Sequence, residues 1–247
     1  MRRISFHSGL LKAMALVVLG VFSASGSLPA EEAWTPPETV IHPGWYARIH
    51  TSMGLIIVRL LPEQAPQSVA HFAAAAEGEL EWNDIITGKP VKERYFDGAQ
   101  VHMAIAGRQF EAGDRTGSGT AAPSVYVPYD EGRGPVNFSV KGRMGLTRAS
   151  GRRISAVQFF ISASAQPWLS GHYPCIGVVV YGNDAALRIT SVKTYGSGRP
   201  LEPVVIEKIR IFSIGDVEPL QEPIPYKPSP LEIAPRKKNG DAASSAP

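Results

Sequence analysis

The chain offers few side chains for covalent or metal chemistry. Its one cysteine, Cys175, lies in the apolar run 175–180, which predicts a small buried thiol and not a nucleophile. The sequence contains no HExxH pattern, no paired cysteines and no GxSxG elbow, which argues against zinc and serine hydrolases. The glycine-rich run 113–120 lacks the Gly-Lys-Ser/Thr ending of a phosphate-binding loop. We therefore expect no metal site and no cofactor.

A second group of residues is suited to binding an apolar ring. Residues 158–171, QFFISASAQPWLSG, set aromatic and apolar side chains between polar ones. This run resembles the stretch that lines the proline pocket of cyclophilin-type peptidyl-prolyl isomerases. The resemblance spans about residues 46–212 and rests on further motifs in the same order. These are TSMG at 51–54, APQSVAHF at 65–72, YFDG at 95–98, GDRTGSGT at 113–120 and RPLEPVVI at 199–206.

The resemblance implies a fold and a reaction. The implied fold is dominated by β-structure, a closed antiparallel barrel of about eight strands capped by two helices. The implied reaction rotates the peptide bond before proline, against a barrier of about 18–20 kcal/mol from lost amide resonance. It needs an apolar slot for the proline ring, groups that hold the flanking backbone, and a donor to the prolyl nitrogen. Since no proton is abstracted, we interpret His102, His50 and His71 as hydrogen-bonded structural residues.

Part of the implied substrate-binding site is retained. Phe160 and Leu169 match the apolar wall of the family's pocket, Trp168 matches its aromatic rim, and Gln158 matches its polar edge. Phe159 and Phe160 are adjacent in a strand, so their side chains point to opposite faces and one of them belongs to the core. The resemblance assigns Phe160 to the pocket.

Other positions depart from the family. Met103 stands where the family has its catalytic arginine, so this position is predicted to be non-functional as a donor. The remaining departures are Arg108 and Gln109 for a phenylalanine and a methionine, Glu111 for a glutamine, Thr147 for an alanine, and Tyr173 for a histidine. Arg108 could swing to supply the lost donor, or it could pair with Glu111 and close the site.

These departures leave three functions open. The leading hypothesis is a peptidyl-prolyl isomerase of reduced activity, because losing one preorganised donor costs about 2.7–4 kcal/mol of transition-state stabilisation. The alternative is a degenerate module that binds proline-containing segments without isomerising them. A purely structural protein of the cell envelope is a third possibility, which only the terminal appendages support.

The apolar patterning predicts the elements that position these residues. Runs 47–52 and 55–61 are rich in isoleucine and valine and predict a hairpin, in which Gly54 can take a positive φ. Residues 66–76 carry apolar side chains at helical spacing, and Gly78 follows as a stop signal.

Later elements are predicted in the same way. Residues 79–94 are interpreted as an excursion before a strand near Val101. A second helix is predicted at 184–192, with Asn183 as its cap. The last strong strand is predicted at 204–212.

The two ends of the chain predict export and a disordered tail. Residues 1–30 resemble a cleaved signal, since basic residues precede the apolar run 13–22 and small residues follow it. That run is short for a bilayer span, although a retained anchor is the alternative reading. Residues 31–45 are interpreted as an extension, 46–214 as the folded domain, and the proline-rich 215–247 as disordered.

Charge and localisation limit the partners. Removing residues 1–30 takes three of the 25 basic residues and none of the 22 acidic ones, so the mature chain is neutral. A neutral chain has no net field to draw it to nucleic acid. We expect a monomer, periplasmic or secreted, that acts on proline-containing segments of exported proteins and has no stable membrane insertion after cleavage.

Overall fold

The computed structural model describes residues 35–38, 40, 42–84, 87–119, 125–128, 135–148 and 153–226. The chain divides into two units, 1–35 and 36–247, and every element below belongs to the second. The predicted signal peptide lies outside the described residues. No helix among those residues is long and apolar enough to cross a membrane.

The predicted hairpin is confirmed. Strands β1 (Gly44–Thr51) and β2 (Gly54–Leu60) pair antiparallel, with Thr51 opposite Gly54 at the turn. The Thr51 hydroxyl donates to the Gly54 carbonyl oxygen at 2.7 Å, and Gly54 has a φ of +125°, which L side chains rarely adopt. Strand β1 starts at Gly44, two residues before the predicted start of the folded domain, and that boundary stays a prediction.

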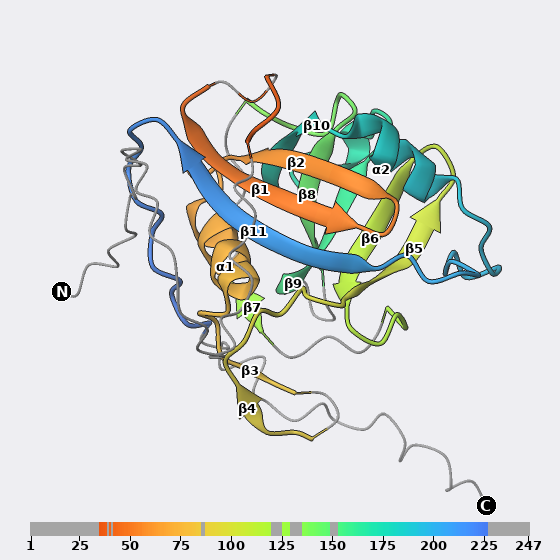
Figure 1. Ribbon diagram of the computed structural model, residues 1–247, viewed down its shortest axis with the longest axis horizontal. Coiled ribbons are helices and arrows are strands. Elements are labelled where there is room, and N and C mark those ends of the chain that lie inside the picture. Colours follow the sequence, from red (N-terminus) through yellow and green to blue (C-terminus); the bar gives the residue numbers. More distant parts are fainter. Residues whose placement is uncertain are drawn as a thin grey trace, which may run out of the picture. The chain divides into compact units, whose positions relative to one another are not determined.

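Among the described residues the fold consists of a nine-stranded antiparallel sheet, a separate two-stranded hairpin and two α-helices, which confirms the predicted β-dominated class (Figure 1). Eight strands follow one path, in the order β11-β1-β2-β10-β8-β9-β6-β5, and β7 (Tyr126–Val127) pairs with β9. The other strands are β5 (Gln100–Ile105), β6 (Gln109–Asp114), β8 (Arg143–Arg148), β9 (Ile154–Ser162), β10 (Cys175–Tyr181) and β11 (Ile206–Ile214). The predicted strands near Val101 and at 204–212 correspond to β5 and β11.

The sheet curls until its two edge strands approach each other. An isolated bridge joins Gln100 to Val205, the Val101 amide donates to the Val204 carbonyl, and the Ile206 amide donates to the Ala99 carbonyl. This contact is short and is not a strand ladder. A strongly curled sheet is therefore established, and the closed barrel stays a prediction.

The first helix, α1 (Pro66–Glu77), forms where predicted. Proline stands in its first turn, where the missing amide proton costs nothing, and Gly78 ends it in the left-handed conformation with a φ of +77°. Nearly all of its side chains are buried, and it packs against β9 and β11.

The second helix, α2 (Asn183–Thr190), differs from the prediction at its start. Its N-cap is Gly182 and not Asn183, which is the first helical residue and makes no capping bond. Gly182 has a φ of +85°, and a Cβ there would overlap the Leu55 carbonyl. Only glycine fits this close approach, so the chain enters the helix one residue earlier than the capping preference indicates.

The predicted excursion at 79–94 contains a small hairpin of β3 (Trp82–Asn83) and β4 (Pro90–Val91). It is anchored to the domain by Trp82, which is buried and packs edge-on against Tyr95 with ring centroids 5.0 Å apart.

The apolar interior has two parts. The main core lies between α1 and the sheet, where Phe72, Phe96 and Phe159 pack with their rings steeply inclined. A second, smaller cluster lies on the other face of β8 and β9. We call it the aromatic cluster, and its buried members are Leu61, Phe138, Phe160 and Cys175.

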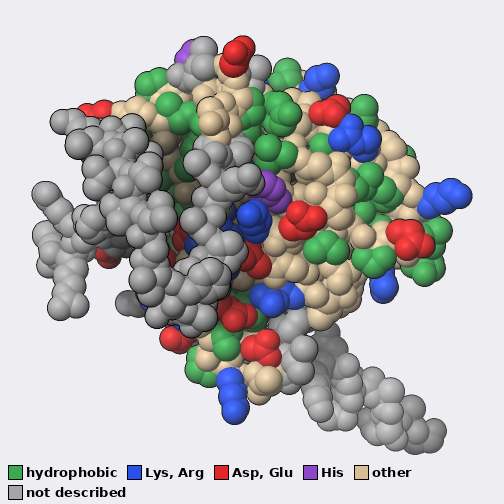
Figure 2. Space-filling model, in the orientation of Figure 1, with side chains coloured by type: hydrophobic (Ala, Val, Ile, Leu, Met, Phe, Trp, Pro, Cys, Tyr) green, Lys and Arg blue, Asp and Glu red, His purple; other side chains and the backbone are tan. Residues whose placement is uncertain are grey.

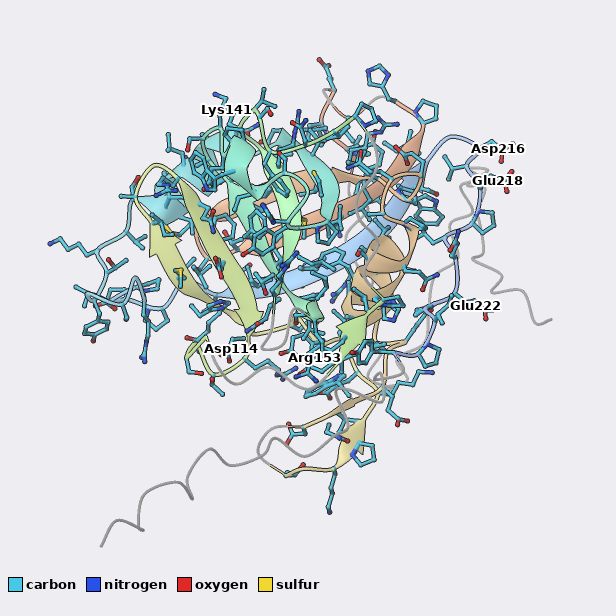
Figure 3. The ribbon with its side chains drawn as sticks, turned by 180° about the vertical axis from the view of Figure 1, so that it is seen from behind. Asp114, Lys141, Arg153, Asp216, Glu218 and Glu222 are labelled. Carbon is cyan, nitrogen blue, oxygen red and sulfur yellow. The ribbon has the colours of Figure 1, made fainter. Side chains whose placement is uncertain are left out.

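The segment after β11 is packed along the domain as far as Tyr226. Val217 and Leu220 contact the main core, and the Trp45 indole donates to the Glu218 carbonyl at 2.8 Å. The Gln67 side chain on α1 bonds to Gln221 and to the backbone at positions 222 and 224. Figure 3 shows Asp216, Glu218 and Glu222 along this stretch, which runs past α1. Of the predicted disordered tail, 215–247, residues 227–247 lie outside the described residues.

Candidate active site

Strand alternation separates the site from the core. On β9, Phe159 faces the main core, whereas Gln158 and Phe160 face the opposite side of the sheet. The neighbouring strands align with β9 so that Glu111 of β6 lies opposite Phe160. Met103 of β5 in turn lies opposite Glu111. The retained and the altered positions of the predicted site therefore share one face of the sheet.

A cavity of about 400 Å³ opens on this face, and we call it the site cavity. Four of the predicted residues line it, namely Met103, Glu111, Thr147 and Gln158. The rest of its lining consists of His102, Ser118, Gly119, Arg148, Ser197 and Arg199. Apart from Met103 and the glycine these side chains are polar, so the cavity differs from a wholly apolar slot.

Gln158 lines this cavity with a mostly buried side chain. The residue is only 7 % exposed, and its Nε2 has no hydrogen-bond partner among the described residues. The Thr147 hydroxyl lies 3.4 Å from the Gln158 carbonyl oxygen and 3.5 Å from its side-chain Oε1. A buried amide donor without a partner costs free energy.

Glu111 is held within the protein. Its Oε1 accepts a hydrogen bond from Gln109 Nε2 at 2.9 Å, and its Oε2 lies 3.7 Å from His102 Nε2. Gln109 is itself buried and contributes to the cavity only through this bond. The prediction that His102 is hydrogen-bonded is not confirmed, because its Nε2 makes the 3.7 Å contact with Glu111 and its Nδ1 is buried without a partner among the described residues. His71 matches its prediction, since its Nδ1 lies 2.8 Å from the Gln67 carbonyl oxygen.

Phe160 does not line the site cavity. Its side chain is 2 % exposed and packs in the aromatic cluster, 5.1 Å from the Phe138 ring and 5.5 Å from the Tyr173 ring. Leu169 and Tyr173 are half-buried against the same cluster. The physical cause is Gly145 on β8, which has no side chain and lets both phenylalanine rings lie directly over its backbone. The resemblance could not reveal this packing.

Arg108 and Trp168 form a separate pair at the rim. The Arg108 guanidinium lies over the Trp168 ring, 5.0 Å from its centroid, and the tryptophan is 54 % exposed. No ion pair joins Arg108 to Glu111 among the described residues, and Arg108 does not line the site cavity. Both roles considered for Arg108 from the sequence therefore lack a contact here.

Arg148 lies between the site cavity and Tyr173, which packs against the aromatic cluster. It lines the site cavity beside Thr147, and its guanidinium lies 5.3 Å from the centroid of the Tyr173 ring. Arg148 and Arg199 were not among the residues predicted from the sequence. Arg148 directly follows a predicted site residue, and Arg199 begins the last family motif, so both signals were present in the sequence.

Two other groups that could react, the Cys175 thiol and the Tyr95 phenol, are buried. Burial raises the pKa of the Cys175 thiol to about 11, so little thiolate exists at neutral pH, as expected for a small buried thiol. Burial also raises the pKa of the Tyr95 phenol, which donates to the Gly113 carbonyl at 2.9 Å. Among the described residues, no three histidine, cysteine, aspartate or glutamate side chains gather as metal ligands.

Comparisons with known proteins agree with this arrangement. The family model described as cyclophilin type peptidyl-prolyl cis-trans isomerase/CLD matches residues 46–211. Peptidyl-prolyl cis-trans isomerase B of Streptomyces anulatus is 34% identical over 167 residues, which cover 66% of this chain and 94% of that protein. Probable peptidyl-prolyl cis-trans isomerase A of Mycobacterium bovis is 30% identical over 167 residues, covering 67% and 91%.

A solved structure shares the fold. The cyclophilin type peptidyl-prolyl cis-trans isomerase of Cryptosporidium parvum, crystallised in the presence of the dipeptide Ala-Pro, has a TM-score of 0.57 to this chain and 23% sequence identity. The match covers 68% of this chain and 99% of that one. The curled sheet, its two helices and the polar cavity on the outer face of β6, β8 and β9 thus belong to a member of the cyclophilin-type peptidyl-prolyl cis-trans isomerase family.

Proposed function

We propose that the protein isomerises peptide bonds before proline in exported proteins, at a lower rate than an arginine-bearing relative. Gln158 carries this proposal: it lines the site cavity, and its buried side-chain Nε2 has no hydrogen-bond partner among the described residues. Membership of the family indicates that the protein is an isomerase. The carbonyl oxygens of a substrate backbone are acceptors that suit the Gln158 amide donor.

The protein catalyses the reaction by holding the bound segment and polarising the peptide bond before proline. Gln158 Nε2 donates to a carbonyl oxygen of the bound segment, and Thr147 keeps the Gln158 side chain in place. Met103 supplies the apolar contact for the pyrrolidine ring. No bond forms or breaks, and the catalytic effect comes from binding the twisted peptide bond better than either planar isomer.

Met103 limits the rate. A thioether has no proton to donate to the prolyl nitrogen, which becomes pyramidal and basic as amide resonance is lost. Removing one preorganised donor costs about 2.7–4 kcal/mol, or two to three orders of magnitude in rate. Met103 therefore favours a slow rate of isomerisation.

The test is exchange spectroscopy on a proline-containing peptide with the native protein and the Met103→Arg variant. We expect the native protein to accelerate cis-trans exchange measurably above the uncatalysed rate, and Met103→Arg to raise the exchange rate further. Native exchange as fast as that of an arginine-bearing relative would contradict the reduced rate.

The second candidate function is binding without isomerisation. It is favoured by the burial of Phe160, which removes an apolar wall from the site cavity. In this case the native protein would shift the peptide resonances on titration but leave the exchange rate at its uncatalysed value. The same experiment thus separates the two functions.

Export is supported by residues 1–30 alone, whose basic start and apolar run 13–22 are typical of a cleaved signal. In this proposal the mature chain is a monomer in the periplasm or outside the cell, acts on proline-containing segments and does not bind nucleic acid. Fractionation of cells that express the full chain, with the mass of the recovered protein, tests it. Recovery of the uncleaved chain from the cytoplasm would contradict export.

A further inference from the structure

Positively charged side chains line the site cavity, although position 103 carries none. Two arginines, Arg148 and Arg199, line the cavity together with Met103. Their places differ. Arg148 lies on β8 next to Thr147 and is stacked on Tyr173, whereas Arg199 lies on the segment between α2 and β11 that passes beside β5 (Figure 1).

The segment that carries Arg199 is a closed turn, which we call the 194–200 loop. A bridge joins Thr194 to Pro200, the Tyr195 amide donates to the Arg199 carbonyl at 2.8 Å, and the Gly198 amide donates to the Tyr195 carbonyl at 2.9 Å. Gly198 has a φ of +84°, which only glycine adopts readily. The backbone on both sides of Arg199 is therefore fixed by local bonds.

This loop is attached to β5 directly beside Met103. The Ala104 amide donates to the Gly198 carbonyl at 2.8 Å, and a Cβ on Gly198 would lie 3.2 Å from Met103 Cγ. The residue before Arg199 thus contacts the side chain that replaces the family's arginine. The Arg199 side chain starts from the same wall of the cavity as Met103.

The guanidinium of Arg199 is available for a ligand. It lies over the exposed Tyr195 ring, 5.9 Å from the centroid, and it makes no ion pair with a carboxylate among the described residues. At that distance the ring holds the guanidinium only weakly. Arginine presents five donors and keeps its charge, so it can reach a nitrogen lone pair without titrating.

We propose that Arg199 is a catalytic residue that supplies the missing donor, giving one N–H to the prolyl nitrogen in the twisted transition state. This assignment rests on the proposed isomerase function. The hydrogen bond forms as the nitrogen becomes pyramidal and is lost as the amide becomes planar again, so no proton is transferred. Met103 then has a role of its own, because a cation at position 103 would repel Arg199 and an apolar side chain contacts the proline ring.

The experiment compares Arg199→Ala, Arg199→Lys and Arg148→Ala with the native protein on one proline-containing peptide. Lys193→Ala is the matched control, because Lys193 is an exposed cation at the start of the same segment and does not line the cavity. Exchange spectroscopy at saturating peptide gives the rate of the bound state, and peptide titration gives the Kd. Circular dichroism verifies the fold of each variant.

We expect Arg199→Ala to lower the catalysed exchange rate about tenfold, less than for a fully buried donor because Arg199 is exposed to solvent. The Kd should change by less than about twofold, since the bond belongs to the transition state. Arg199→Lys should retain part of the rate, and Lys193→Ala all of it. Met103→Arg should raise the rate more in the Arg199→Ala protein than in the native one, because the two arginines then substitute for each other.

Either of two results of the rate measurement would overturn the assignment while leaving the proposed function intact. One is an exchange rate of Arg199→Ala equal to that of Lys193→Ala, and the other is a loss of rate that occurs in Arg148→Ala alone. If the native protein catalyses no exchange, the proposed function fails and the assignment fails with it. A parallel loss of rate and affinity in Arg199→Ala would show that the side chain binds substrate and is not a transition-state donor.

Discussion

At the scale of single residues, one glycine decides where the predicted pocket wall lies. Gly145 faces Phe160 across the β8–β9 pair, and a Cβ at this position would lie 2.6 Å from Phe160 Cζ and 2.8 Å from Phe138 Cζ. Both rings occupy the space of the absent side chain. Phe160 therefore packs in the aromatic cluster, and its predicted contact with the substrate stays a prediction.

Gly145→Ala should destabilise the protein by about 1–3 kcal/mol, because an added methyl group forces two well-packed rings to move. Gly196→Ala is the matched control, since a Cβ there meets nothing within 4 Å and its φ is not in the left-handed region. Urea denaturation of both variants measures the effect. Equal midpoints would show that the aromatic cluster is loosely packed.

The sequence predicted the site residues unevenly. Positions that line the site cavity, such as Gln158 and Thr147, were found because a motif places them on the correct face of a strand. Arg199 was missed because its approach to Met103 depends on a bond between a loop and β5, residues distant in sequence. Motifs record residue types along the chain, whereas such contacts arise from packing.

At the scale of elements, local signals were reliable where the chain turns sharply. Gly54 and Gly78 marked the hairpin and the end of α1, because each requires a positive φ. The start of α2 was misplaced by one residue, since the clash that demands Gly182 comes from β2. The prolines of residues 216–226 led to the prediction of disorder, whereas the contacts of that backbone with Gln67 and Trp45 come from distant parts of the chain.

Removing the segment after β11 should lower the stability of the domain. A chain that ends at Gly215 loses the packing of Val217 and Leu220 and the bonds to Gln67, which together contribute about 2 kcal/mol. A chain that ends at Tyr226 keeps these contacts and serves as the control. Thermal unfolding should place the first chain several degrees below the second, and equal melting temperatures would contradict a packed segment.

At the scale of the whole molecule, the first feature is the distribution of charge on the surface. Figure 2 shows basic and acidic side chains interspersed on one face, without a patch of one sign. This agrees with the small net charge of the sequence. The family resemblance implied a closed antiparallel barrel, and closure stays a prediction because it depends on the few bonds between β5 and the start of β11.

Closure can be measured by hydrogen exchange. The amides of Val101 and Ile206 donate across the junction at 2.9 and 2.7 Å, so we expect them to exchange as slowly as amides in the interior strands. The Ala104 amide, which bonds to the 194–200 loop, provides an internal comparison. Fast exchange at both junction amides would mean that the sheet opens readily between its edges.

The stacking of Arg108 on the exposed Trp168 also makes the intrinsic fluorescence of this tryptophan a reporter of binding. Trp45 and Trp82 are 8% and 2% exposed, whereas Trp168 is 54% exposed at the rim of the site. With Trp34, which lies outside the described residues, replaced by phenylalanine, a soluble quencher such as acrylamide therefore reaches Trp168 before the two buried indoles. A peptide that enters across the rim must displace or cover the guanidinium, so the quenchable part of the emission reports occupancy without any attached label.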